Sequence, residues 1–300
     1  MSSLWVGFTL VGAAGQVARN AMQRQLTGPL GIWGATNIRF VFGLPFALVF
    51  FVAALVFSGE TIPPPGAMFG PMFGFWLMLG ALSQIIATGL MLSAMTDRSF
   101  TVTTAYLKTE AVQTAIFGLV FLGDGFGPFR LLAIVIASVG VAVAGVRIGR
   151  SSNFAEIRPL LTGLAAAAGF ALSSVGFRGA IISIGDVSFV IAASLTLVLG
   201  LTLQTLLLTV FLLLRGRNVL RAMLALWRPS LFAGFVGALA SQFWFLAFAQ
   251  TPVANVRTLA LIEVVFAQVA AVTVLRQKLV WREVAGAVLI VVGVALLLSV

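Results

Sequence analysis

Long, uninterrupted apolar runs constrain the fold of this chain more than any other feature. Two of them cover residues 131–146 and 284–300. A helix needs about 20 apolar residues to cross the hydrocarbon core of a bilayer. The chain is 61% hydrophobic and 9% charged, whereas soluble domains are about 45–50% apolar and about 25% charged. Transmembrane β-barrels show short alternating segments instead. The runs therefore predict an all-α integral membrane protein.

Breaks between the runs predict ten transmembrane helices in two groups of five. The first five-helix repeat is expected at residues 1–149, a linker at 150–159 and the second repeat at 160–300. The second, third and seventh helices look too long to cross without tilting or kinking. The expected spans are 4–22, 30–57, 67–95, 101–122, 128–147, 160–182, 186–214, 229–249, 254–275 and 282–299.

The two halves resemble each other in sequence. An ungapped shift of 153 residues places Glu110 on Glu263 and residues 139–142 on 292–295. Upstream, residues 80–84 resemble 237–242, and residues 15–24 match 169–178 at their ends. Because five is odd, the second half enters the membrane from the opposite side. Inverted repeats of this kind are typical of secondary transporters.

Composition argues against an enzyme. The chain has no cysteine and no histidine, which excludes thiolate metal sites and histidine acid–base chemistry. No nucleophile elbow or Walker A loop is present, so we expect no cofactor and no metal. The net charge of +10 comes from scattered basic residues, which is typical of topology signals rather than of a nucleic-acid-binding surface.

Five charged residues lie clearly inside the expected spans, after those assigned to loops and helix ends are set aside. Each costs about 2.5–3.5 kcal/mol at a helix centre on insertion scales, so these side chains are expected to face the bundle interior. Arg39 and Glu110 lie at similar depth, which predicts either a structural ion pair between them or a role in substrate binding. The five are Arg19, Arg39, Lys108, Glu110 and Glu263.

Polar side chains form stripes on the first and fourth expected helices. Gln16, Arg19, Asn20 and Gln23 share one face of the first helix, and the face of Glu110 is similarly polar. On a regular helix Lys108 points away from that face. Packing alone would explain several of these residues equally well. The predicted substrate-binding residues are Gln84, Thr88, Tyr106, Lys108, Glu110, Ser241, Gln242, Trp244 and Glu263.

Glu263 differs from Glu110 in its expected surroundings, because its helical face is otherwise apolar. One hypothesis is that Glu263 couples transport to protons. The alternative is a buried ion pair that orients the ninth helix.

Several local patterns resemble the drug/metabolite transporter superfamily, specifically its ten-helix EamA-like members. Residues 28–30, followed by Arg39 and Phe40, resemble the stretch that leads into the family's second helix. Residues 94–110 and 247–263 resemble the run from one helix into the next in each half. The segment Leu122-Gly123-Asp124 resembles the Leu-Gly-Glu that closes the fourth helix, and residues 275–277 depart from that pattern.

The resemblance implies a membrane exporter of small metabolites with a central cavity formed by the third, fourth, eighth and ninth helices. Aromatic and other neutral amino acids are the best-matching substrates, and drug or cation and nucleotide-sugar transport are the alternatives. The cation branch usually carries a carboxylate in the first helix, where this chain has Arg19. A passive channel is a competing class. We expect a monomer in a bacterial inner membrane, with the lipid bilayer and a small-molecule substrate as its partners and no nucleic acid.

Basic residues near the helix ends predict the membrane orientation. Twelve fall on the side of the 150–159 linker and three on the other side, so the positive-inside rule places the linker in the cytoplasm and both termini outside. The family's usual arrangement is the reverse. The replacement Ser152→Cys in this cysteine-free chain should therefore resist an impermeant thiol reagent in intact cells and react after lysis. Reaction in intact cells would contradict the orientation from the charge count.

Overall fold

The chain folds into a bundle of helices in a computed structural model. The structure describes residues 4–60, 62, 66, 70–97, 103, 106–125, 127–145, 154–185, 187–215, 217–265 and 281–299. No strand occurs in these ranges. Five helical stretches are long and apolar enough to cross a membrane, and three shorter apolar helices accompany them. The prediction of an all-α, multi-pass membrane protein is confirmed at this level.

The first half contains α1 (Leu4–Val41), α2 (Leu44–Ser58), α4 (Pro71–Asp97), α6 (Glu110–Phe117), the π-helical turn η1 (Gly118–Leu122) and α7 (Pro128–Gly145). The second half contains α8 (Phe154–Ser183), α9 (Phe189–Arg215), α10 (Arg217–Ala225), α11 (Trp227–Gln250), α12 (Val253–Leu259) and α14 (Trp281–Leu298).

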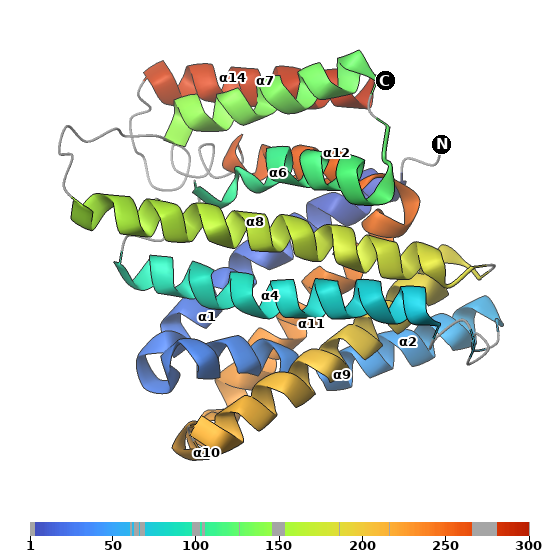
Figure 1. Cartoon of the computed structure of the whole chain (residues 1–300), viewed down its shortest axis with the longest axis vertical. Helices are drawn as coiled ribbons and strands as arrows, with labels where there is room; N and C mark the ends of the chain where they lie inside the picture. The colour runs from blue at the N-terminus through green and yellow to red at the C-terminus, as the bar shows by residue number, and fades with distance from the viewer. Residues whose placement is uncertain are drawn as a thin grey trace.

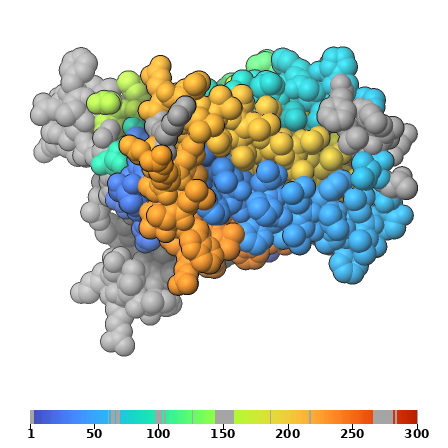
Figure 2. All heavy atoms as spheres, turned by 90° about the horizontal axis from the view of Figure 1, so that it is seen from below, coloured from blue at the N-terminus to red at the C-terminus, as the bar shows by residue number. Residues whose placement is uncertain are grey.

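The outer faces of the helices are apolar. Figure 2 shows one such face, on which α2 and α9 lie beside α10 and the start of α11. Phe57 is 90% exposed and Leu214 is 80% exposed, and many further large apolar side chains project outward from these helices. An apolar surface this extensive is not tolerated in water, so it is the surface that lipid covers.

Three helix pairs form the framework of the bundle. Helix α4 packs along α8, α1 packs along α11, and α7 packs along α14 (Figure 1). The α7–α14 pair forms a separate layer at one edge of the molecule, as expected for the fifth and tenth apolar runs, which are almost free of polar residues. Each pair joins one helix from the first half of the chain to one from the second.

Glycines allow α7 and α14 to approach closely. A Cβ atom added at Gly293 would lie 2.6 Å from the backbone nitrogen of Ala137, and one added at Gly140 would lie 2.8 Å from the carbonyl oxygen of Gly286. Small residues at such contacts are how membrane helices gain packing energy without a hydrophobic effect between them.

The first helix is longer than the sequence predicted. Residues 23–29 were expected to be a loop, but α1 continues through them and through Pro29 to a kink at Gly31, whose φ is 66°. The second break falls at Phe42 and Gly43, inside the expected second helix. The apolar run of residues 30–57 is therefore divided between the end of α1 and α2, because glycine, and not hydropathy, determines where the backbone bends.

The boundary of the second half also differs from the prediction. Helix α8 begins at Phe154 and includes Pro159, so the second half of the expected 150–159 linker is helical. Residues 146–153, with the proposed labelling site Ser152, and residues 266–280 lie outside the described residues. The short helix α10 was not predicted at all.

The fourth and ninth expected spans are interrupted helices in the parts that the structure describes. Lys108 and Thr109 form a turn immediately before α6, and Ala260 and Leu261 form a turn immediately after α12. Their backbone bonds have the tighter spacing of a 3₁₀ turn, for example from the nitrogen of Leu261 to the carbonyl oxygen of Thr258 at 3.1 Å. The expected continuous helices 101–122 and 254–275 are wrong at these positions.

The glycine contacts predict that adding a methyl group destabilises the protein at a packed glycine but not at an open one. Gly293→Ala should lower the thermal unfolding midpoint in detergent, because the new methyl group meets backbone that cannot rotate away; overpacking of this kind costs about 1–3 kcal/mol. Gly7→Ala is the matched control, since no atom lies within 4 Å of its added Cβ. An unchanged midpoint for Gly293→Ala would contradict the close α7–α14 contact.

Candidate functional site

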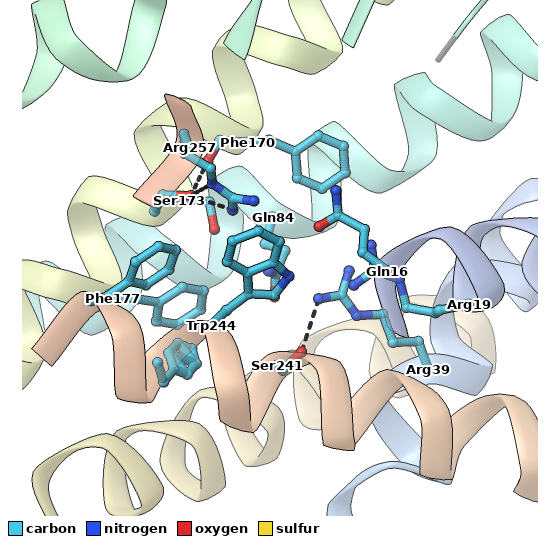
Figure 3. A pocket seen from close by; sticks show the side chains of 13 residues that line it. Gln16, Arg19, Arg39, Gln84, Phe170, Ser173, Phe177, Ser241, Trp244 and Arg257 are labelled. Atoms are coloured by element: carbon cyan, nitrogen blue, oxygen red, sulfur yellow. Dashed lines mark hydrogen bonds between the residues drawn. The ribbon is translucent and has the colours of Figure 1, made fainter. Parts of the chain in front are cut away.

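A polar cavity lies where α1, α4, α8, α11 and α12 meet. It is partly open to its surroundings and has about 340 Å³ of space not occupied by atoms, open solvent included. Figure 3 shows arginine side chains approaching it from two sides, with the indole ring of Trp244 between them. Its lining residues are Gln16, Arg19, Arg39, Gln84, Phe170, Ser173, Ser174, Phe177, Ser241, Trp244, Phe245, Phe248 and Arg257.

Helix α1 supplies two of the three arginines. Arg19 lies before the Gly31 kink and Arg39 after it, so the kink brings both side chains to one end of the cavity (Figure 3). Arg19 donates hydrogen bonds from Nε and Nη2 to Oδ1 of Asn20, at 3.2 and 2.9 Å. Arg39 donates one bond from Nη2 to Oγ of Ser241 at 3.3 Å. Both arginines are at least 97% buried.

Helix α12 supplies the third arginine on the other side of Trp244. Nε of Arg257 lies 2.8 Å from Oε1 of Glu110, and its Nη2 donates a hydrogen bond of 2.7 Å to Oγ of Ser174. The guanidinium also lies 4.3 Å from the centre of the Trp244 ring, within the range of a cation–π interaction. Arg257 therefore joins α12 to α6, α8 and α11.

A second cavity of about 440 Å³ of empty space adjoins the first. It shares Gln16, Arg19 and Phe170 with the first and adds Lys108, Glu110 and Glu263. Nζ of Lys108 forms an ion pair with Oε1 of Glu263. The two glutamates that the repeat relates thus both lie beside the interrupted helices, and each has a cationic partner.

Six of the nine predicted site residues line one of these cavities. Gln84, Ser241 and Trp244 line the first, and Lys108, Glu110 and Glu263 line the second.

The other three predicted site residues are not among the lining residues of these two cavities. Thr88 bonds the carbonyl of Gln84, and the amide of Gln242 donates to Oγ of Ser194 at 2.8 Å. Tyr106 is half-buried against Gly163.

The expected ion pair between Arg39 and Glu110 is wrong. Arg39 does not pair with Glu110, because Arg257 occupies that carboxylate and Arg39 bonds Ser241. Lys108 and Glu110 do line the same cavity, although a regular helix would point them apart. The turn at Lys108 and Thr109 changes the direction of the side chain, so a helical-wheel argument does not apply across it.

Sequence reasoning missed Arg257 as a site residue. Thr251 and Pro252 form the break that was expected, but Arg257 was counted with the basic residues near helix ends. Its position one turn and a half before Glu263 was the available signal, since an arginine that close to a buried carboxylate is a candidate partner. Arg19 and Arg39 were recognised as buried but were not included in the predicted site.

A second group of polar contacts is centred on Arg178 at one end of the bundle, and we call it the Arg178 latch. Arg178 lies one helical turn beyond Ser174 on α8. Its Nη1 donates to the carbonyl oxygens of Phe248 and Thr251, at 2.5 and 2.7 Å. Its Nη2 lies 3.7 Å from Oδ1 of Asp124, which follows η1. These bonds connect α8, the end of α11 and the loop after η1, at the end of the bundle where both termini lie (Figure 1).

The arrangement of the site fits a binding cavity rather than a catalytic centre. The comparison of this chain with family models agrees. Residues 157–299, just under half of the chain, match the model of the EamA-like transporter family. The second half is thus similar to an EamA-like transporter domain. That similarity indicates a multi-pass membrane transporter of the drug/metabolite type with a small-molecule substrate, and such a family is not generally enzymatic.

The other two comparisons bear on the fold alone. No curated protein matches the chain in sequence. A solved crystal structure superposes with a TM-score of 0.64, covering 97% of this chain and 95% of its own, at 16% identity. The shared architecture therefore extends over nearly the whole chain, well beyond the part that matches the family model.

The Arg178 latch predicts how Asp124→Asn behaves. Without the carboxylate the latch keeps only its carbonyl contacts, so a cysteine at Ser173 in the cavity should react faster with an impermeant reagent added from the termini side. The test uses vesicles of each orientation. Glu60→Gln, a change of an exposed carboxylate, is the control. Equal labelling of the parent Ser173→Cys protein and the double variant would contradict a closing role.

Acidification should affect the same pair. Burial raises the pKa of the Asp124 carboxyl, and the Arg178 guanidinium opposes this rise. The folded state therefore takes up a proton at a higher pH than the unfolded chain, so the contribution of Asp124 to stability is greatest in acid and is lost as pH rises through its raised pKa. The unfolding midpoint of wild type relative to Asp124→Asn should consequently increase as pH falls. A constant difference between the two proteins would contradict the raised pKa.

Proposed function

We propose that the chain is a secondary transporter that exports small metabolites by alternating access through the central cavity. The observation that carries the proposal is the arginine-lined cavity between helices of both halves, beside two interrupted helices. Broken helices are tolerated at membrane depth only where they line a cavity or are buried in protein. In transporters they commonly hold the substrate site.

Contacts between the halves support the proposal of two inverted five-helix repeats and ten membrane helices. A Cβ atom added at Gly15 would lie 2.9 Å from the Cβ of Ala240, and one added at Gly169 would lie 2.9 Å from the Cβ of Ala87. Gly15 and Gly169 are repeat-related, and a shift of 153 residues relates Ala87 to Ala240. The α1–α11 and α4–α8 pairs are thus two copies of one interface.

The same shift describes the α7–α14 contact, in which Gly140 approaches Gly286 and Gly293 approaches Ala133. These contacts favour an ungapped alignment of the third and eighth helices. Such an alignment relates Gln84 to Gly237, in place of the pairing of residues 80–84 with 237–242 that the sequence suggested.

The two ends of the cavity differ, which alternating access requires. Arg24 and Arg178 are repeat-related, yet Arg178 is bonded in the latch and Arg24 is exposed. We infer that the conformation is closed at the termini end and that the opposite state would exchange these environments. A passive channel is disfavoured, because a channel needs no closed end.

Aromatic and other neutral amino acids remain the substrates that the sequence resemblance favours. The aromatic lining residues suit an apolar side chain, and the arginines suit a carboxylate. Cationic drugs fit poorly, since a cation in the first cavity would face Arg19, Arg39 and Arg257. Export from a bacterial cytoplasm across the inner membrane follows from the family resemblance.

Counterflow in liposomes tests the proposed function. Protein reconstituted into liposomes preloaded with unlabelled phenylalanine should accumulate external labelled phenylalanine transiently and saturably, without nucleotide. Protein-free liposomes are the control. The panel also contains sugars, a nucleotide sugar and organic cations. Exchange of another solute alone would remove the amino-acid assignment, linear uptake without saturation would indicate a channel, and no exchange of any solute would contradict the transporter.

A further inference from the structure

The first cavity has an unbalanced charge. Arg19, Arg39 and Arg257 line it, and no carboxylate does. Among the acidic side chains that the structure describes, only Glu110 and Glu263 line either cavity, and both line the second. Four cationic side chains and two anionic ones therefore gather where the two cavities meet.

Both carboxylates already have partners. Glu110 lies against Arg257, and Glu263 lies against Lys108. Within the part of the chain that the structure describes, the Arg19 side chain hydrogen-bonds only the neutral amide of Asn20. The Arg39 side chain hydrogen-bonds only the hydroxyl of Ser241 and lies over the ring of Phe40, and neither arginine is within ion-pair distance of a described carboxylate. Buried charges are normally paired, because taking an unpaired ion out of water is costly. Two buried guanidinium groups are thus available to a ligand.

Hydrogen-bond donors around the cavity lack acceptors. Nε and Nη1 of Arg39 and Nε1 of Trp244 are buried without a hydrogen-bond partner among the described residues. An arginine and an indole nitrogen can only donate. Both side chains reach the cavity in Figure 3. A ligand that satisfies them must supply acceptor oxygens and, to balance the arginines, negative charge.

The remaining wall of the cavity is aromatic. Its apolar lining consists of Phe170, Phe177, Trp244, Phe245 and Phe248. The rings of Phe177 and Phe245 meet edge to face with centroids 4.7 Å apart, so this wall is already well packed. Such a surface favours one flat apolar group placed beside the arginines, since ring contacts add to the burial of area.

We propose that the cavity binds an organic anion: a carboxylate held by Arg39 and Arg19, joined to an aromatic group, with no ammonium group. The planar guanidinium fork matches a carboxylate in two hydrogen bonds. An ammonium group in the same space would face three guanidinium groups and would find no free carboxylate. The inference rests on the proposed function and narrows its substrate class from zwitterions to net anions.

Three matched compounds test this preference on the wild-type protein. 3-Phenylpropionate, phenylalanine and phenethylamine carry the same ring on a two-carbon chain. The first has a carboxylate, the third has an ammonium group, and phenylalanine has both. At pH 7.5, where the acid is ionised, labelled 3-phenylpropionate should undergo counterflow. Unlabelled 3-phenylpropionate should halve this counterflow at about one tenth of the concentration at which phenylalanine halves it. This ratio corresponds to a difference of about 1.4 kcal/mol in binding free energy. Phenethylamine should not compete. Protein-free liposomes measure leakage of the acid.

Substitution of Arg39 tests the site. Arg39→Gln should remove most of the preference for the anion over phenylalanine, and Arg39→Lys should retain part of it, because lysine keeps the charge and loses the fork. Arg221→Gln removes the same charge from an exposed position and should leave the preference unchanged. Size-exclusion profiles show which variants fold. The comparison of the three compounds on the wild-type protein does not depend on whether the variants fold.

The outcomes separate this inference from the proposed function. Phenylalanine competing as well as or better than 3-phenylpropionate overturns the anion preference and leaves the transporter intact. The same holds if only non-aromatic solutes of the wider panel are exchanged. A folded Arg39→Gln protein with an unchanged preference overturns the assigned site. Failure of every solute to exchange overturns the inference and the proposed function together.

Discussion

Within hydrocarbon, the backbone can leave its helical hydrogen bonds only where protein or a cavity replaces them, and most of this structure follows from that requirement. The chain meets it with helices everywhere outside short breaks. The breaks at Lys108–Thr109 and at Ala260–Leu261 are the informative exceptions. Each retains 3₁₀-type bonds, each turns its helix, and each places a glutamate beside a cavity. The interruption of the fourth and ninth helices and the position of the site therefore have one physical cause.

Buried charge is the second organising element. Arg257 connects Glu110, Ser174 and the ring of Trp244, so it holds four helices in register through one side chain. Removing either member of such a pair leaves an uncompensated charge, which costs about 3–5 kcal/mol. The fold alone therefore explains the paired charged residues. It does not explain Arg39, because two of its nitrogens are buried without hydrogen-bond partners. A buried donor that the fold leaves unsatisfied indicates a ligand.

Predictions from the sequence succeeded where the position of a residue along the chain was sufficient. Hydropathy identified an all-helical, multi-pass membrane protein, and burial cost identified Arg19, Arg39, Lys108, Glu110 and Glu263 as interior residues. The predictions failed where the direction of a side chain mattered. The depth of Arg39 suggested Glu110 as its partner, but depth along a helix does not say which neighbour a side chain faces. The wheel argument for Lys108 assumed a helix that is broken at that residue. Arg257 was overlooked because an arginine near a helix end looks like a topology signal until the break beside it is seen.

The internal repeat makes the differences between the halves as informative as the similarities. The glycine contacts of α1 with α11 and of α8 with α4 are equal in distance, so the two interfaces share their packing. Arg24 and Arg178 occupy related positions in those interfaces, yet one is exposed and the other binds two carbonyl oxygens and approaches Asp124. The helix packing is similar in the two interfaces, but the polar contacts differ. The helical frameworks therefore match, whereas the two ends of the cavity differ. A protein with a single symmetric resting state would have no reason to hold its two ends differently. The proposed alternating access would, because in that mechanism the polar contacts that close one end are broken when the other end closes.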